Sequence, residues 1–310
     1  MSLLSLPPSL SGWMAVQSVP RLSSTLGVEL ELLEERMIYG LPGGKALAAL
    51  SAYNDALGML IEDHGVSWVE VYGHTDVGRE RRHLVEEMRL GCDGSVVEVA
   101  CGRGYTTTPL AERVAEVTSI DLMNGYGRTG WWGEFRSLMG FLGLLRKVSG
   151  IRSEASRMPL KDDSFPVAMS AHAMRNFPGR ETIVAALREM RRITWSGGRV
   201  IIAENIPVTT KKAQEAHLMM FNLKTRLLSG EKPLYTLSEY REMFVEAGLE
   251  PHDVRILNIE YSATPPIFIP DPDVLNRSEQ VREEYENAVA MIREHGEVSP
   301  PVLFVEAEVK

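Results

Sequence analysis

Hydrophobic and polar positions alternate in blocks through the middle of the chain, from about residue 78 to residue 206. Short apolar stretches of strand length, at 96–99, 117–120 and 200–203, are separated by longer stretches with the spacing of amphipathic helices. Strands that alternate with helices predict a parallel sheet covered by helices on both faces. The pattern therefore indicates an α/β fold with a doubly wound, Rossmann-like sheet.

The residues before this core, 1–77, predict a helical N-terminal extension. Apolar residues at helical spacing favour helices over 27–38 and 45–64, and residues 68–72 are expected to form a short strand or a turn. A further helix over 79–90 leads into the first strand. Four nearby acids are expected to form a solvated helix face: Glu29, Glu31, Glu34 and Glu35.

Two helical insertions interrupt the second half of the core, at about 207–233 and 265–300. The second separates the last two expected strands, 254–261 and 302–309, so the core domain is expected to span 78–310. Such insertions either cover a substrate pocket, or they only pad the core or form a dimer contact. Both interpretations are compatible with the sequence.

The most informative motif is an apolar strand that runs into a glycine turn at 96–105 and is followed by a second strand ending in Asp121. Gly102 and Gly104 lack Cβ, so the backbone there can approach a ligand closely. Asp121 lies at the distance along the chain where an acid accepts hydrogen bonds from two ribose hydroxyls. This arrangement predicts a nucleoside cofactor.

Two residues distinguish between nucleoside cofactors. Thr107 occupies the place where a dinucleotide fingerprint needs a third small residue. Glu98, at the carboxyl end of the strand, would repel a pyrophosphate but suits a ligand that carries an ammonium and a sulfonium. A nicotinamide-dependent dehydrogenase is therefore disfavoured.

The segment Glu98-x-Ala100-Cys101-Gly102-x-Gly104 resembles motif I of the class I S-adenosylmethionine-dependent methyltransferases. Further segments resemble that family in the same order, at 153–160, 162–170, 173–177 and 187–204. The segment 173–177 is similar to the Gly-Leu-Arg-Asn segment of the ubiquinone/menaquinone C-methyltransferases. The resemblance covers about 78–206, with a weaker match at 236–260.

The resemblance implies a seven-stranded sheet with an antiparallel last strand and S-adenosyl-L-methionine as cofactor. Within it, Asp121 would bind the ribose, Leu122 would lie beside the adenine, and Glu154 would accept from the adenine amino group. The full set of cofactor-binding residues that it implies is Glu98, Ala100, Gly102, Gly104, Asp121, Leu122, Glu154, Ala155 and His172.

The acceptor is encoded less clearly than the cofactor. His172 follows the fourth strand, where it either removes a proton from the acceptor as a catalytic base or packs beside the methionine part of the cofactor. The aromatic and glycine-rich segment 125–133 either borders the adenine or the acceptor, or packs in the core. The substitutions Pro166 and Trp195-Ser196 depart from the family pattern near this region.

Composition narrows the classes of partner. The net charge is −9 and no run of lysine or arginine occurs, so binding of long nucleic acid is not expected. Cys92 and Cys101 show neither metal-ligand spacing nor a disulfide framework. The most apolar helical stretch, 138–145, is too short to span a bilayer and no secretory signal is recognised, so a cytoplasmic protein is expected.

These observations predict a methyltransferase that transfers a methyl group to a small, apolar or aromatic acceptor by in-line displacement. Carbon and oxygen are both possible acceptor atoms, and no metal is expected. Residues 1–77 are expected to cap the active site. The alternative is a protein that binds S-adenosylmethionine without catalysis, for regulation or for structure.

Overall fold

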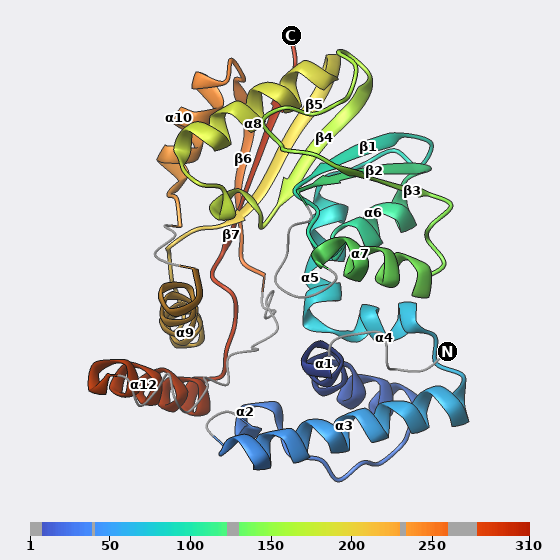
Figure 1. Ribbon diagram of the computed structural model, residues 1–310, viewed down its shortest axis with the longest axis vertical. Coiled ribbons are helices and arrows are strands. Elements are labelled where there is room, and N and C mark those ends of the chain that lie inside the picture. Colours follow the sequence, from blue (N-terminus) through green and yellow to red (C-terminus); the bar gives the residue numbers. More distant parts are fainter. Residues whose placement is uncertain (1–7, 39–40, 123–129, 230–233, 260–277) are drawn as a thin grey trace. The chain divides into compact units, whose positions relative to one another are not determined.

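The computed structural model describes residues 8–38, 41–122, 130–229, 234–259 and 278–310 (Figure 1). The chain divides into two compact units, and each is described by itself. The helical unit comprises 1–80, 208–232 and 259–300. The sheet unit comprises 81–207, 233–258 and 301–310.

The sheet unit contains a seven-stranded sheet in the order β3-β2-β1-β4-β5-β7-β6. Strands β1 to β5 are paired in parallel, and β7 is antiparallel to both β5 and β6. This confirms the predicted fold class. The strands are β1 (Ser95–Val99), β2 (Glu116–Asp121), β3 (Val148–Arg152), β4 (Phe165–Ala171), β5 (Thr194–Asn205), β6 (Pro251–Leu257) and β7 (Val302–Glu308).

The strand order reverses at the junction of β1 and β4. Strand β1 has β2 as its neighbour on one side and β4 on the other, and β5 lies beyond β4. Glu98 pairs with Ser119 of β2 and with Met169 of β4, so it lies on the central strand of this junction. In open α/β sheets, ligands bind outside the carboxyl ends of the strands at such a reversal.

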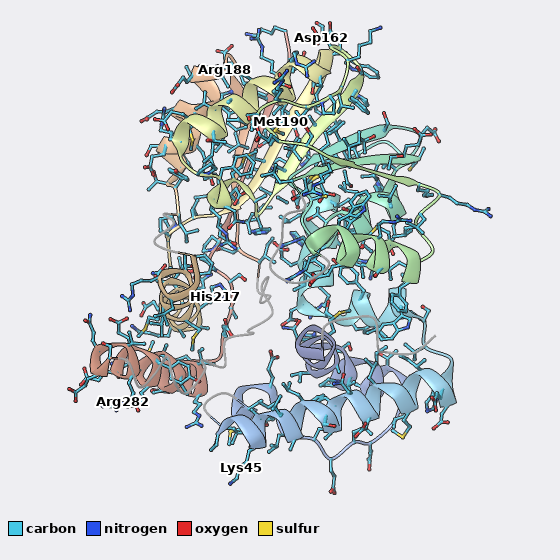
Figure 2. The ribbon with its side chains drawn as sticks, in the orientation of Figure 1. Lys45, Asp162, Arg188, Met190, His217 and Arg282 are labelled. Carbon is cyan, nitrogen blue, oxygen red and sulfur yellow. The ribbon has the colours of Figure 1, made fainter. Side chains whose placement is uncertain are left out.

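The main core of the sheet unit lies between the sheet and two helices, α8 (Arg180–Ile193) and α10 (Leu237–Glu246). Helix α8 buries one apolar face that includes Leu187 and Met190, whereas the side chain of Arg188 is 57% exposed (Figure 2). The remaining helices of this unit are α5 (Asp76–Glu87, which crosses the boundary between the units), α6 (Thr107–Arg113) and α7 (Gly130–Phe141).

Two arginines tether the carboxyl end of α5 to the sheet. Arg199 of β5 donates from Nη1 to the carbonyl of Met88 at 2.9 Å. Arg255 of β6 donates to the carbonyl of Glu87 at 3.2 Å and also to its carboxylate. Because cations are favoured at the carboxyl end of a helix, these contacts fix α5 against the β5–β6 half of the sheet.

The start of β5 is irregular. The strand begins at Thr194, before the double glycine, and its pairing with β4 shifts register between Phe165 and Val167. A Cβ on Gly198 would lie 2.7 Å from the carbonyl oxygen of Pro166. The double glycine therefore accommodates a bulge inside the ladder.

The helical unit is assembled from all three of its segments. Helix α1 packs against α3 and α4, α9 packs against α12, and α12 contacts α2. The helices are α1 (Pro8–Leu26), α2 (Glu35–Ile38), α3 (Gly43–His64), α4 (Trp68–His74), α9 (Lys212–Ser229) and α12 (Glu279–His295). The side chains of His217 on α9 (labelled in Figure 2) and Glu297 after α12 are 6% and 9% exposed. His217 Nδ1 and Glu297 Oε1 lie 2.9 Å apart.

Two expectations for the N-terminal segment were wrong, because residues 28–34 are not helical and residues 68–72 lie in α4. A further helix, α1, which was not predicted from the sequence, spans Pro8–Leu26 and contains Pro20. Helix α4 is favoured by a capping box in which Ser67 and Glu70 bond each other's backbone amides.

The four acids of that segment do not share a solvated helix face. Glu29, Glu31 and Glu34 are exposed but lie outside any helix. Glu35 is the exception, because burial and the nearby carboxylates of Asp76 and Glu297 raise its pKa to about 7.

Candidate cofactor site

The turn after β1 has a backbone that ordinary residues rarely adopt. Ala100, Gly102 and Gly104 have φ of 60°, 54° and 89°. The amide of Cys101 donates to the carbonyl of Ile120 at 3.1 Å, which ties the turn to β2. A non-glycine residue in this region is strained, so Ala100 is held there by the surrounding structure.

Asp121 joins the turn to the end of β2. It is 8% exposed, and its Oδ2 accepts a hydrogen bond from the amide of Gly102 at 2.9 Å. The next residue, Leu122, is 49% exposed although it is apolar. A carboxylate beside an exposed apolar side chain provides the two surfaces that a ribose and a purine ring require.

Glu98 lies beneath the turn, where it is 2% exposed. Its Oε2 accepts hydrogen bonds from the hydroxyls of Thr107 and, at 3.3 Å, Ser119. Burial raises the pKa of Glu98 to about 8, against the opposing effects of these two bonds and of Arg81. Thr107, which departs from the dinucleotide pattern, therefore serves as a hydrogen-bond donor to the motif I acid.

The two predicted adenine-side residues follow β3 directly. Glu154 is exposed, and its carbonyl accepts from the amide of Arg157 at 3.1 Å. Ala155 is partly buried and packs against the main core. The amide of Ser153 donates to the carbonyl of Asp121 at 3.0 Å, which places this segment beside the ribose acid.

The backbone at Gly104 lies close to side chains of α7. A Cβ at this position would lie 2.9 Å from side-chain atoms of Phe135 and Met139 on α7. Trp132 stacks on Phe135 with ring centroids 6.1 Å apart and also covers Gly150 of β3. Trp132 and Met139 therefore pack in the core. Residues 125–129 of the aromatic segment lie outside the described residues.

His172 is the first residue after β4 and also has a left-handed backbone, with φ of 52°. Its amide donates to the carbonyl of Ala203 at 2.8 Å, and its ring bonds the side chain of Asn205. Burial, followed by the charges of Arg81 and Arg175, holds the pKa of His172 well below its ordinary value. The imidazole is therefore neutral at pH 7.

Glu204 holds the same turn. Its Oε1 accepts from the amides of Ala173 and Met174 at 2.6 and 2.7 Å, and it is fully buried. Burial raises the pKa of Glu204, whereas the charge of Arg175 and these two hydrogen bonds lower it. Three consecutive residues of β5, from Ala203 to Asn205, thus form hydrogen bonds with the turn that contains His172.

The structure brings the predicted residues to one edge of the sheet. Glu98, Asp121 and His172 follow or end three adjacent strands, and Glu154 follows the next strand outward. Sequence reasoning missed the residues that support them: Arg81, Thr107 as a hydrogen-bond donor, Ser119 and Asn205. Only Thr107 and Ser119 carried a signal, because both lie within the motif segments.

The edge fits an S-adenosyl group. The buried side chain of Asp121 and the exposed Leu122 suit ribose and adenine, and Glu98 is the acid that would face a methionine ammonium. Burial also raises the pKa of the Cys101 thiol well above its ordinary value, so this cysteine is not an activated nucleophile.

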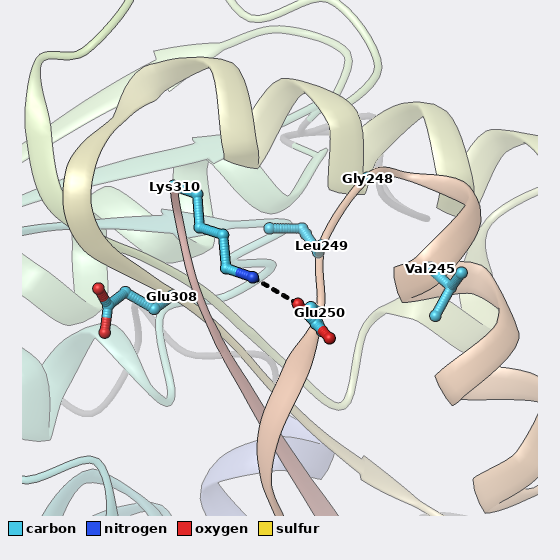
Figure 3. A pocket seen from close by; sticks show the side chains of 6 residues that line it. All are labelled: Val245, Gly248, Leu249, Glu250, Glu308 and Lys310. Carbon is cyan, nitrogen blue, oxygen red and sulfur yellow. Dashed lines mark hydrogen bonds and ion pairs between the residues drawn. The ribbon is translucent and has the colours of Figure 1, made fainter.

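No cluster of three or more metal-ligating side chains occurs among the described residues. No helix there is long and apolar enough to cross a membrane. A surface hollow between Glu250, Glu308 and Lys310 lies by the amino-terminal end of β5, at the edge opposite the carboxyl ends (Figure 3).

Comparison with known proteins supports the assignment of the fold. Residues 97–202 match the sequence profile of a family described as a methyltransferase domain. A demethylmenaquinone methyltransferase of Mycobacterium tuberculosis is 30% identical over 124 residues, which are 40% of this chain and 46% of that protein. A ubiquinone/menaquinone biosynthesis C-methyltransferase of Idiomarina loihiensis is 28% identical over 153 residues, covering 46% of this chain and 58% of that protein.

A solved structure resembles the chain more broadly. The cyclopropane-fatty-acyl-phospholipid synthase-like protein of Lactobacillus casei gives a TM-score of 0.57 at 16% identity, covering 77% of this chain and 92% of that one. The chain spans about half the length of the curated relatives that it matches. The matched segment, the strand order and the motif I turn together place residues 97–202 in a methyltransferase domain of the class I S-adenosylmethionine-dependent superfamily, with resemblance to the ubiquinone/menaquinone C-methyltransferases.

Proposed function

We propose that this chain is an S-adenosylmethionine-dependent methyltransferase that acts on a small, apolar or aromatic acceptor. The observation that carries the proposal is the bond between the Gly102 amide and Asp121, at the point where the strand order reverses. It joins the motif I turn to the ribose acid inside the segment that matches the methyltransferase family.

S-adenosylmethionine supplies the methyl group on a sulfonium, which is its own leaving group. The protein then has to hold donor and acceptor in line and to exclude water, and orientation can lower such barriers by up to about 7–11 kcal/mol in favourable cases. Asp121 would bind the ribose hydroxyls, and Glu98 would attract the methionine ammonium from beneath the turn. The neutral His172 would lie beside the methionine part rather than act as a strong base, because its pKa is depressed.

We propose carbon methylation of a quinone-like ring as the specific reaction, with oxygen methylation as its nearest alternative. The names of the similar proteins from Mycobacterium tuberculosis and Idiomarina loihiensis support a quinone acceptor. Arg175 and Asn176 match the segment of those enzymes, although in this chain the charge of Arg175 acts on Glu204. We also propose that residues 1–77 cap the active site and that the protein is cytoplasmic.

Calorimetric titration with S-adenosylmethionine and S-adenosylhomocysteine tests the cofactor. We expect micromolar binding to the wild type and loss of binding in Asp121→Ala. Asp121→Asn keeps an oxygen that accepts from the Gly102 amide but removes the carboxylate. It therefore separates the effect of a disturbed turn from the effect of a lost ribose contact. Asp162→Asn is the matched control, because Asp162 pairs with Arg192 on the surface. Absence of binding to the wild type would contradict the proposal.

Incubation with methyl-labelled donor and a panel of naphthoquinols and phenols tests the reaction. Label in a small aromatic product supports the proposal, and mass spectrometry distinguishes carbon from oxygen methylation. Binding of the donor without transfer to any acceptor would favour the non-catalytic alternative. Label found only in protein or RNA would contradict a small acceptor.

A further inference from the structure

Three buried side chains in the core of the sheet unit carry an oxygen atom that has no hydrogen-bond partner. They are Ser170 on β4, Glu204 on β5 and Tyr240 on α10, and all three residues are fully buried. Ser170 Oγ, Glu204 Oε2 and Tyr240 Oη form no hydrogen bond with any of the described residues. Such atoms are rare in protein interiors, because an unsatisfied buried polar group costs free energy.

The three side chains lie on the same face of the sheet. Ser170 pairs with Ile202 of β5, and Glu204 pairs with Leu303 of β7. Residues directly opposite each other on neighbouring strands point to the same face. Ile202 and Leu303 belong to the main core, which also contains Tyr240. All three oxygen atoms therefore belong to the layer between the sheet and the helices α8 and α10.

Electrostatic interactions connect Glu204 and Tyr240 across this layer. Burial, followed by the charge of Glu204, raises the pKa of Tyr240 well above its ordinary value. The phenol is therefore protonated at pH 7, and its O–H group is a hydrogen-bond donor. Arg175 interacts with both Glu204 and Tyr240, so the two side chains approach the same guanidinium from β5 and from α10.

The chemistry of the three oxygen atoms suits one small neutral molecule. Tyr240 offers a donor, Glu204 Oε2 an acceptor, and the Ser170 hydroxyl can act as either. The charge of Arg175 disfavours a cation in this place, and the carboxyl group of Glu204 disfavours an anion. A buried water molecule both donates and accepts, and it typically forms about three hydrogen bonds with groups that are otherwise unsatisfied.

We propose that one internal water molecule binds Glu204 Oε2, Tyr240 Oη and Ser170 Oγ. The other carboxyl oxygen of Glu204 accepts from two amides of the turn that contains His172. The water therefore links α10, through Glu204, to this turn at the candidate cofactor site. It gives α10 a supporting role there, and it does so whether or not the protein transfers a methyl group.

A crystal structure of the wild type at high resolution tests the proposal directly. We expect electron density for a water molecule within about 3.2 Å of each of the three oxygen atoms. In Tyr240→Phe the water loses one of its partners, so its density should weaken. A direct hydrogen bond between Tyr240 and Glu204, or a wild-type site without the water, would overturn the proposal.

Thermal unfolding gives a second test, because the two possible states of the Tyr240 hydroxyl predict shifts of opposite sign. If the hydroxyl binds the water, Tyr240→Phe should lower the unfolding midpoint by about 2–4 °C, the effect of losing one ordinary hydrogen bond. If the hydroxyl is unsatisfied, its removal should raise the midpoint. The control is Tyr235→Phe, which should change the midpoint little, since the partly buried Tyr235 contacts the Tyr240 ring edge-on with centroids 5.8 Å apart. An unchanged or higher midpoint in Tyr240→Phe would overturn the proposal.

Hydrogen exchange tests the link between α10 and the turn. The amides of Ala173 and Met174 are bonded to Glu204, so they respond to Tyr240 only through the proposed water. They should exchange about fivefold faster in Tyr240→Phe than in the wild type, and at the wild-type rate in Tyr235→Phe. Equal exchange in Tyr240→Phe and the wild type would overturn the link.

Discussion

At the scale of single residues, the site depends on acids and a histidine whose charges are suppressed. Glu98 keeps its proton to about pH 8 because burial outweighs the hydrogen bonds from Thr107 and Ser119 and the charge of Arg81. His172 is neutral for the same physical reason, since burial disfavours the charged form of either group. A cofactor that carries an ammonium and a sulfonium would supply the positive charge that Glu98 lacks.

Glu98→Gln should stabilise the protein increasingly as the pH rises. The folded state holds the Glu98 proton to about pH 8, whereas the unfolded chain releases it near 4.5, so the free energy of unfolding falls with pH across this window. The amide variant lacks this dependence, and its advantage should reach at most about 3 kcal/mol at pH 7. Urea unfolding from pH 5 to 8.5 measures it, with the exposed Glu116→Gln as control. A difference that does not vary with pH would contradict the pKa shift.

His172 should remain neutral through the physiological pH range. Its folded-state pKa lies well below 6.5 because of burial and the charges of Arg81 and Arg175. In a spectrum of histidine-labelled protein, the signal that disappears in His172→Ala should therefore show no titration between pH 6 and 8. A midpoint near 6.5 would restore the interpretation of His172 as a base tuned to neutral pH.

At the scale of elements, the end of β5 shapes the edge at which the ligand is expected. Ala203, Glu204 and Asn205 each bond a group of the turn that follows β4. These bonds maintain the positive φ of His172, which costs energy for a residue with a side chain. The strand is therefore both a member of the sheet and a support for the neighbouring turn.

Glu204→Ala should destabilise the sheet unit by about 2–4 kcal/mol, because it leaves the buried amides of Ala173 and Met174 without an acceptor. Glu204→Gln keeps an acceptor oxygen for both amides but removes the charge that acts on the buried Arg175, so it should also destabilise the unit, with less opening of the turn than in Glu204→Ala. Hydrogen exchange at residues 172–175 measures the local effect. Equal exchange in both variants would show that the two hydrogen bonds do not hold the turn.

At the scale of the whole molecule, the chain builds two units from interleaved segments. The helical unit gains its second and third segments from the insertions after β5 and between β6 and β7. The pair of His217 and Glu297 joins these two insertions in its interior. Glu284, which lies on α12 itself, pairs with Arg226 of α9 at the surface.

Glu297→Ala should loosen the pairing of α9 with α12 and leave the sheet unit intact. Removing the buried carboxylate beside His217 should destabilise the helical unit more than the surface variant Glu284→Ala, which should cost less than about 1 kcal/mol. Hydrogen exchange in 212–229 and 279–295 should rise in the first variant alone, with exchange in β1 and β4 unchanged. Similar effects of the two variants would contradict a special role of the buried pair.

Local patterns were sufficient to predict the sheet and the ends of its central strands. Glu98, Asp121 and His172 could be placed at one edge because parallel strands with crossover helices end on the same side. Their partners could not be predicted. Whether Thr107 reaches Glu98, or Asn205 reaches His172, depends on register between strands and on rotamers that no local pattern encodes.

The secondary structure of the N-terminal segment was predicted less well, because its local sequence preferences conflict with the tertiary packing. Pro20 disfavours the interior of a helix, yet α1 continues through it, since tertiary packing against α3 and α4 outweighs the local preference. Glu35 looked like a solvated acid because its burial involves Asp76 and Glu297, which are far away in the sequence. The assembly of three separate segments into one unit has no local signature.

The position of β7 between β5 and β6 determines when the protein can finish folding during its synthesis. Strand β7 consists of residues 302–308, so the β5–β7–β6 half of the sheet is incomplete until they leave the ribosome. At roughly 5–20 residues per second, the helices of residues 8–74 wait on the order of ten seconds or more for α12. Loss of the last strand would leave long β5 and β6 edges unpaired, so a nascent or shortened chain is the form most exposed to aggregation and to chaperones.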